Sequence, residues 1–71
     1  MASLLPGKFK EHLVLDRQEI ADRLRHLADQ IGQGTISLGS VQATVPERAE
    51  YEVELEVNHQ KRELEIEVKW R

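Results

Sequence analysis

Charged and apolar residues alternate almost without a break along the last third of the chain, over residues 50–57 and 63–70. Successive side chains of a β-strand point to opposite faces, so this alternation predicts two strands with one apolar and one polar face each. The apolar face contains Tyr51, Val53, Leu55, Val57, Leu64, Ile66, Val68 and Trp70, and the polar face contains Glu52, Glu54, Glu56, Glu63, Glu65 and Glu67. The pattern predicts an amphipathic hairpin whose turn lies within residues 58–61, with Trp70 in the core.

The turn of this hairpin lacks the Asn-Gly pair that would define its type, so its register stays open. If Val57 faces Leu64, Tyr51 faces Trp70, and on the polar face glutamates lie opposite glutamates. Like charges directly opposite each other are unfavourable. A neighbouring basic strand would offset them.

Residues 8–15 are predicted to supply that strand. Phe9, Leu13 and Leu15 would lie on one face and Lys8, Lys10 and His12 on the other, although Glu11 interrupts the apolar side. We expect this strand to lie beside residues 63–70, because basic and acidic side chains would then alternate.

A helix is predicted to begin after Asp16, which has the side chain of a helix N-cap and is followed three residues later by Glu19, as in a capping box. Leu15 and Ile20 are spaced as a hydrophobic staple. The apolar positions with the spacing of one helix face are Ile20, Leu24, Leu27, Ala28 and Ile31. Gly32 or Gly34 is expected to end the helix.

Two short strands, residues 35–38 and 41–45, are expected to form a second hairpin around Gly39 and Ser40, and Pro46 to end it. Together these elements predict an α+β fold in the order β-α-β-β-β-β. One helix would pack on the apolar face of a twisted, mostly antiparallel sheet of about five strands. Residues 1–7 are expected to form a flexible arm, and residues 8–71 a single domain.

Charge and composition narrow the classes of function. The net charge of −3 is uneven, because residues 50–71 contain seven acidic and four basic residues whereas residues 1–49 contain six of each. Without a basic stripe the chain does not match a nucleic-acid binder. It also lacks cysteine, an apolar stretch of the roughly 20 residues that span a bilayer, and the pattern of a secretory signal. We therefore expect a cytoplasmic protein with no membrane association.

Candidate chemistry is sparse. The three histidines, His12, His26 and His59, do not have the spacing of a zinc site, and His26 with Asp29 offers only two potential ligands. The glycines around Gln33 follow a helix instead of preceding one, which is the wrong polarity for binding phosphate. We expect no enzymatic activity, no metal and no cofactor.

The expected function is therefore that of a small protein-interaction module, which binds through a sheet edge or through the glutamate face. The candidate binding residues are Glu52, Glu54, Glu56, Glu63, Glu65 and Glu67, which would favour a basic segment of a partner protein. The same glutamates also fit a solvated, solubilising surface. An alternative function is that of a homodimer or larger structural homo-oligomer joined by edge strands.

The capped helix, the short hairpin, the pair Val45-Pro46 and above all the closing segment of residues 63–70 resemble the amphi-Trp domain family, over about residues 8–70. That family is named for an amphipathic terminal strand that ends in tryptophan. The resemblance implies the fold of these small prokaryotic domains and no established activity. The middle turn at Gly39 and Ser40 departs from the family in lacking acidic residues.

Overall fold

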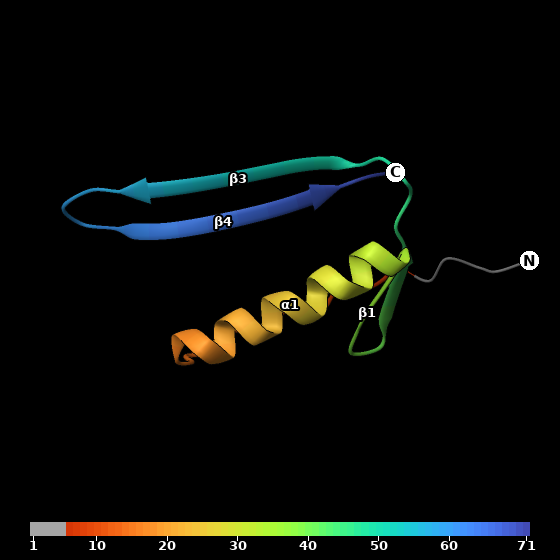
Figure 1. The fold of residues 1–71 in the computed structure, drawn as a ribbon, viewed down its shortest axis with the longest axis horizontal. Helices are drawn as coiled ribbons and strands as arrows, with labels where there is room; N and C mark the ends of the chain where they lie inside the picture. The colour runs from red at the N-terminus through yellow and green to blue at the C-terminus, as the bar shows by residue number, and fades with distance from the viewer. Residues whose placement is uncertain (1–5) are drawn as a thin grey trace, which may run out of the picture.

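The computed structural model describes residues 6–71, which form one helix and four strands. These are α1 (Arg17–Gln33), β1 (Thr35–Leu38), β2 (Val41–Thr44), β3 (Glu50–Val57) and β4 (Arg62–Lys69). The strands form two separate two-stranded antiparallel sheets, β1–β2 and β3–β4 (Figure 1). The expected sheet of about five strands in the order β-α-β-β-β-β is therefore wrong, although the chain does combine one helix with antiparallel hairpins.

The predicted first strand is absent, because residues 6–15 have no strand conformation. This segment comes before the helix in the chain and contacts it, since Glu11 accepts a 2.8 Å bond from Arg23 of α1. Residues 6–15 pair with neither of the two sheets, and Val14 is 94% exposed. The expected pairing with residues 63–70 is consequently wrong. Of the expected arm, residues 1–5 lie outside the described residues.

The helix boundaries follow the local sequence, as predicted. Asp16 is the N-cap: its Oδ1 accepts a 2.8 Å hydrogen bond from the Glu19 backbone N–H, and Glu19 Oε1 accepts one of 3.2 Å from the Asp16 N–H. This reciprocal pair is a capping box. At the other end Gly34, with φ of 92°, is the C-cap, which resolves the choice between Gly32 and Gly34.

The β1–β2 hairpin packs against the helix. Its tight turn places Gly39 at φ 59°, with the ring of Phe9 lying directly against this glycine. Gln30 of α1 accepts a 2.7 Å bond from the Ser37 N–H in β1, and the Val45 N–H donates to the Gly34 carbonyl at 2.8 Å. The helix, β1 and the start of the connection to β3 are therefore held together by hydrogen bonds.

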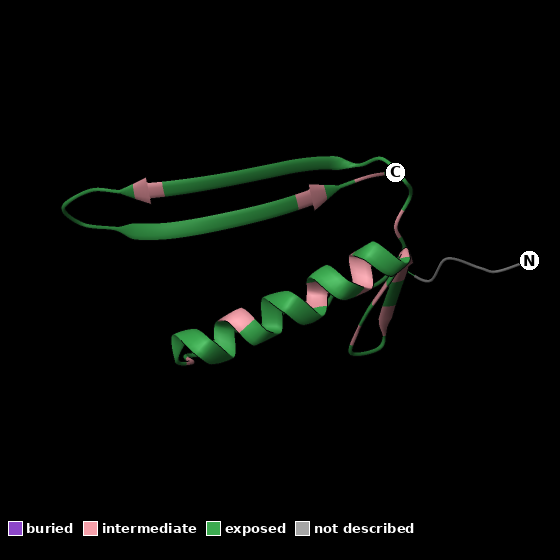
Figure 2. Ribbon diagram, in the orientation of Figure 1, coloured by how far each residue is buried: buried purple, intermediate pink, exposed green. Residues whose placement is uncertain are grey.

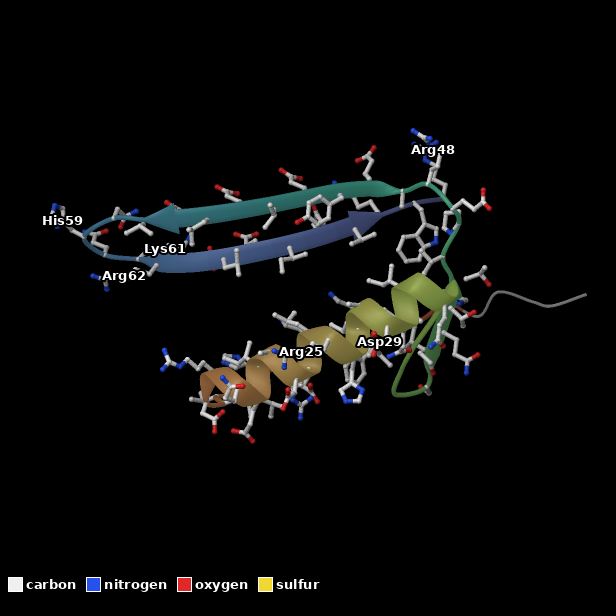
Figure 3. All side chains as sticks on the ribbon, viewed as in Figure 1. Arg25, Asp29, Arg48, His59, Lys61 and Arg62 are labelled. Carbon is white, nitrogen blue, oxygen red and sulfur yellow. The ribbon has the colours of Figure 1, made fainter. Side chains whose placement is uncertain are left out.

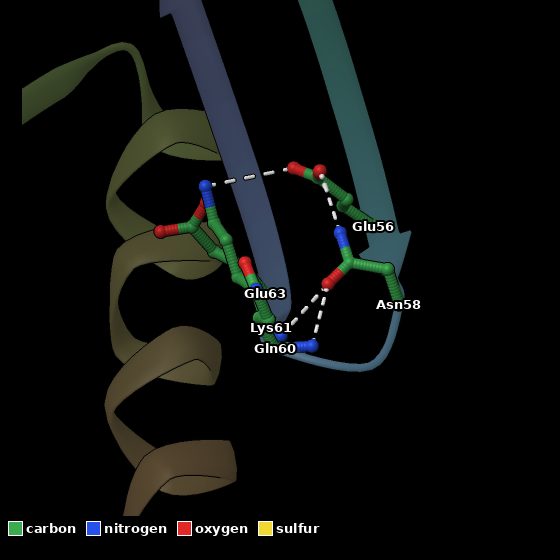
Figure 4. Close-up of polar contacts among 5 residues, drawn as sticks. All are labelled: Glu56, Asn58, Gln60, Lys61 and Glu63. Carbon is green, nitrogen blue, oxygen red and sulfur yellow. Dashed lines mark hydrogen bonds and ion pairs between the residues drawn. The ribbon is translucent and has the colours of Figure 1, made fainter.

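The β3–β4 hairpin has the predicted two faces and a different register from the one considered. Tyr51 lies opposite Val68 and Leu55 opposite Leu64, so Trp70 falls beyond the last pair and does not face Tyr51. The four-residue turn explains the shift, since Asn58 Oδ1 accepts 2.9 Å bonds from the N–H groups of Gln60 and Lys61 (Figure 4). An Asx turn of this kind determines which residues pair.

None of the described residues is buried, and partly covered positions are scattered over the helix and both hairpins (Figure 2). Helix α1 contacts β1, and the β3–β4 hairpin has no backbone contact with any other element. The expected helix on the long hairpin's apolar face is thus not formed, and Trp70, expected in the core, is only partly covered. The radius of gyration is 14.4 Å, against about 11 Å for a compact domain of this length.

Candidate protein-docking surfaces

A wide apolar groove of about 1010 Å³ separates α1 from the β3–β4 hairpin. Both elements run in roughly the same direction (Figure 1), and residues of both line the groove. We define the docking groove by the residues that line it: Leu24, Leu27, Ala28, Ile31, Gly32, Gln33, Gly34, Ile36, Leu38, Val45, Pro46, Glu47, Ala49, Glu50, Tyr51, Ile66, Val68 and Trp70. Most of these side chains are apolar, so the groove exposes apolar surface to water.

One wall of the groove is the part of the hairpin's apolar face formed by Tyr51, Ile66 and Val68. The same face continues beyond the groove to Val53, Leu55 and Leu64. Strand alternation and the observed register bring Val53 opposite Ile66 and Leu55 opposite Leu64, all on one face. Val53 is 49%, Ile66 50% and Leu55 71% exposed. Contiguous exposed apolar side chains of this kind are candidates for an interaction surface.

The other wall is the apolar face of α1. Leu24, Leu27 and Ile31 recur at the spacing of one helix face and line the groove together. The polar residues lie elsewhere on the helix, where Arg25 forms a 2.7 Å ion pair with Asp22. Figure 3 labels Arg25 and Asp29 on the helix below the hairpin. The helix thus has one apolar face and one polar face, as the hairpin does.

The groove ends where the chain passes from β2 to β3. Val45 and Pro46 line it there together with Ala49, and Trp70, which directly follows β4, lies in the same lining. Trp70 combines a large apolar ring with an N–H donor.

The opposite face of the hairpin contains the six predicted glutamates, which the structure brings together on one surface. Glu52 lies opposite Glu67, Glu54 opposite Glu65, and Glu56 opposite Glu63. The supposed register gave different glutamate pairs, but the expectation that like charges face each other is confirmed.

Basic residues neutralise only part of this glutamate face. At the hairpin tip, Lys61 Nζ lies 3.1 Å from Glu63 and 3.5 Å from Glu56 (Figure 4). His59 and Arg62 also lie at this end (Figure 3). At the other end, Lys69 Nζ is 3.5 Å from Glu67. In the described part of the chain, Glu52, Glu54 and Glu65 form no ion pair.

The crowding shifts the pKa values of Glu63 and Glu65 and of the neighbouring Lys61. Hydrogen bonding to Lys61 lowers the pKa of Glu63, and the same contact with Glu63 raises the pKa of Lys61. Hydrogen bonding with Glu63 and the negative charge of that residue, with a smaller contribution from Glu54, raise the pKa of Glu65. Of these two glutamates, Glu65 is the one that favours its charged form less.

The described residues do not assemble a candidate metal site. Across residues 6–71, no group of three or more histidine, aspartate or glutamate side chains is placed to hold a metal ion. The pair considered from the sequence, His26 and Asp29, lies on the exposed surface of α1. No helix in the described part of the chain is long and apolar enough to cross a membrane.

The docking groove was missed by reasoning from the sequence, which assigned both of its walls to one core. A signal was available. The apolar faces of the helix and of the hairpin have similar lengths, so either one could cover the other or a matching element of a partner.

Comparison with known proteins gives one result for the whole chain. The model of the Amphi-Trp domain matches residues 6–71. Searches of curated proteins and of solved structures found no match. The resemblance drawn from the terminal strand and the capped helix is thus confirmed.

Proposed function

We propose a protein-docking function for this chain, which belongs to the Amphi-Trp domain family. The observation that supports this function is the exposure of two apolar faces across one groove, with no buried residue in the described part of the chain. Apolar surface on this scale drives protein association. The protein acts in this proposal as a non-enzymatic interaction module, and its lack of cysteine is compatible with the cytoplasm.

A second candidate surface is the glutamate face, which would bind a basic protein segment. The observation in its favour is that Glu52, Glu54 and Glu65 form no ion pair within residues 6–71 and face other glutamates. A basic segment would relieve that repulsion. Each exposed ion pair contributes only about 0–1 kcal/mol, so binding here would need several contacts and would weaken with salt.

A capture experiment with matched variants separates the two surfaces. Ile66→Arg places a positive charge on the apolar face, and Glu65→Arg places the same charge on the opposite face one residue away. Partners cross-linked in native lysate are compared for the wild type and both variants, with and without about 1 M salt, which screens exposed charges.

If the groove binds the partner, capture is lost in Ile66→Arg, retained in Glu65→Arg and resistant to salt. If the glutamate face binds it, Glu65→Arg and salt abolish capture and Ile66→Arg does not. Capture that is unaffected by both substitutions would show that neither face is a docking surface.

A further inference from the structure

We propose that the docking groove is covered by a second copy of this chain, in a dimer where the β3–β4 hairpin of each copy packs its apolar face on α1 of the other. This inference rests on the proposed docking function and names the partner. The two copies would exchange their hairpins, so the two interfaces would be related by a twofold axis.

The exposed area supports an extensive interface. The chain has 7162 Å² of accessible surface, whereas a folded monomer of 8.2 kDa exposes about 4,500 Å². The difference is about 2,600 Å² for one copy. Obligate homodimers bury about 2,000–5,000 Å² in total over both copies. Two copies together have a surplus of about 5,200 Å², which lies at the upper end of the area that such an interface removes from water.

The two apolar faces match in length and chemistry. The 17-residue helix is about 26 Å long at 1.5 Å per residue, and the eight-residue strands are about 26 Å long at 3.3 Å per residue. A helix laid on a two-stranded sheet would thus cover it from end to end. An isolated two-stranded hairpin is at best marginally stable in water and needs such a layer.

The connection between β2 and β3 favours exchange over closure within one chain. Val45 is bound to Gly34 at the end of α1 by a 2.8 Å hydrogen bond, and Pro46 follows with a restricted φ. Only residues 46–49 remain to direct the hairpin, and it stands away from its own helix without backbone contact. Short, constrained hinges of this kind favour swapping of an element between identical chains.

Charge favours packing through the faces over packing through the strand edges. In the exchanged dimer the glutamate face stays in water. Pairing β4 with β4 of the other copy would instead place Glu63, Glu65 and Glu67 beside the same residues of the partner, and neighbouring like charges destabilise a sheet.

Mixing two charge variants tests the exchange. Ile66→Arg alters the hairpin face and Leu24→Glu the helix face, and Glu65→Arg and His26→Glu deliver the same charges to residues outside the groove. Mass is measured by sedimentation equilibrium, helix content by circular dichroism, and exposed apolar surface by binding of the dye ANS.

The wild type and both control variants are expected to have twice the 8.2 kDa chain mass. For each groove variant alone, the dissociation constant of the dimer should rise more than about a hundredfold, because an uncompensated charge in an apolar interface is strongly unfavourable. An equimolar mixture of the two groove variants should recover the dimer. One of its two interfaces has only wild-type faces, and the other joins two opposite charges. If the single variants lose helix content, mixing should restore it.

Several results would overturn the exchanged dimer. A dimer that is not restored by mixing, or that Glu65→Arg dissociates, would show a different packing. A wild-type monomer that binds ANS would refute the dimer and leave the groove open for another protein, as the proposed function requires. A wild-type monomer with a compact radius and no ANS binding would refute both proposals, since the hairpin would then cover its own helix.

Discussion

Replacing Asp16 by alanine tests whether the local sequence alone determines where α1 begins. The substitution removes the carboxylate that accepts the 2.8 Å bond from the Glu19 N–H, and it keeps the backbone N–H of residue 16, which donates to the Glu19 side chain. Both residues are exposed, so water can replace part of what is lost. N-cap substitutions of this kind cost about 0.5–2 kcal/mol.

We expect a loss of about 1 kcal/mol in the free energy of unfolding, within that range, because the freed N–H is hydrated and not trapped in a core. For a domain of 60–100 residues, 1 kcal/mol lowers Tm by about 4–8 °C. The measurement is urea and thermal unfolding followed by circular dichroism of the helix.

Two matched variants make the measurement specific to the cap. Asp16→Asn retains a side-chain acceptor and should lose at most a few tenths of a kcal/mol. Asp22→Ala removes the same type of side chain from the same helix, where it pairs with Arg25 at 2.7 Å with both groups about two-thirds exposed. Such a pair contributes about 0.2–0.5 kcal/mol. Equal unfolding curves for Asp16→Ala and Asp22→Ala would contradict the capping argument.

Three further predictions concern the helix end, the glutamate face and the groove. Gly34→Ala should destabilise the fold by about 1–2 kcal/mol, because Gly34 has φ of 92°. Gly32→Ala has open space around it and should stabilise the fold by up to about 1 kcal/mol. Equal urea midpoints for the two variants would show that a Cβ does not strain the C-cap. Because the pKa of Glu65 is raised above 4.5, its stabilising contribution is complete below that pH and is lost as the pH rises through the raised value. The urea midpoint should therefore fall above pH 4.5, and Glu65→Gln should reduce that fall; the lowered pKa of Glu63 acts in the opposite sense below pH 4.5. Trp70 is only partly covered in one copy, so its emission should shift to shorter wavelength as protein concentration rises, and an unchanged spectrum would exclude a partner chain at that end of the groove.

The features that were predicted correctly depend on residues close together in the chain. The capping box of Asp16 and Glu19 spans one helical turn, and the two faces of the long hairpin follow from the geometry of each strand. The turn at Gly39 needs only a residue that tolerates positive φ. In each case the energy that selects the conformation comes from neighbouring residues.

The features that were wrong depend on which distant segments meet. Residues 8–15 were assigned to a strand on the basis of charge complementarity with β4, but a lysine-rich face has no unique partner when exposed ion pairs contribute so little. Glu11 pairs instead with Arg23 on the helix. The register of β3–β4 was open because the hydrogen bonds accepted by Asn58, and not the apolar pattern, determine it.

The amino-acid sequence by itself determined the helix, its caps, the two hairpins, the apolar and glutamate faces, and membership of the Amphi-Trp domain family. Only the tertiary structure decided that the hairpins form separate sheets and that an open groove lies between the long hairpin and α1. The physical reason is that strand alternation and helical spacing identify which side chains need to be buried. They do not identify what buries them, since apolar attraction is non-directional and equally satisfied by another segment or by another copy of the chain.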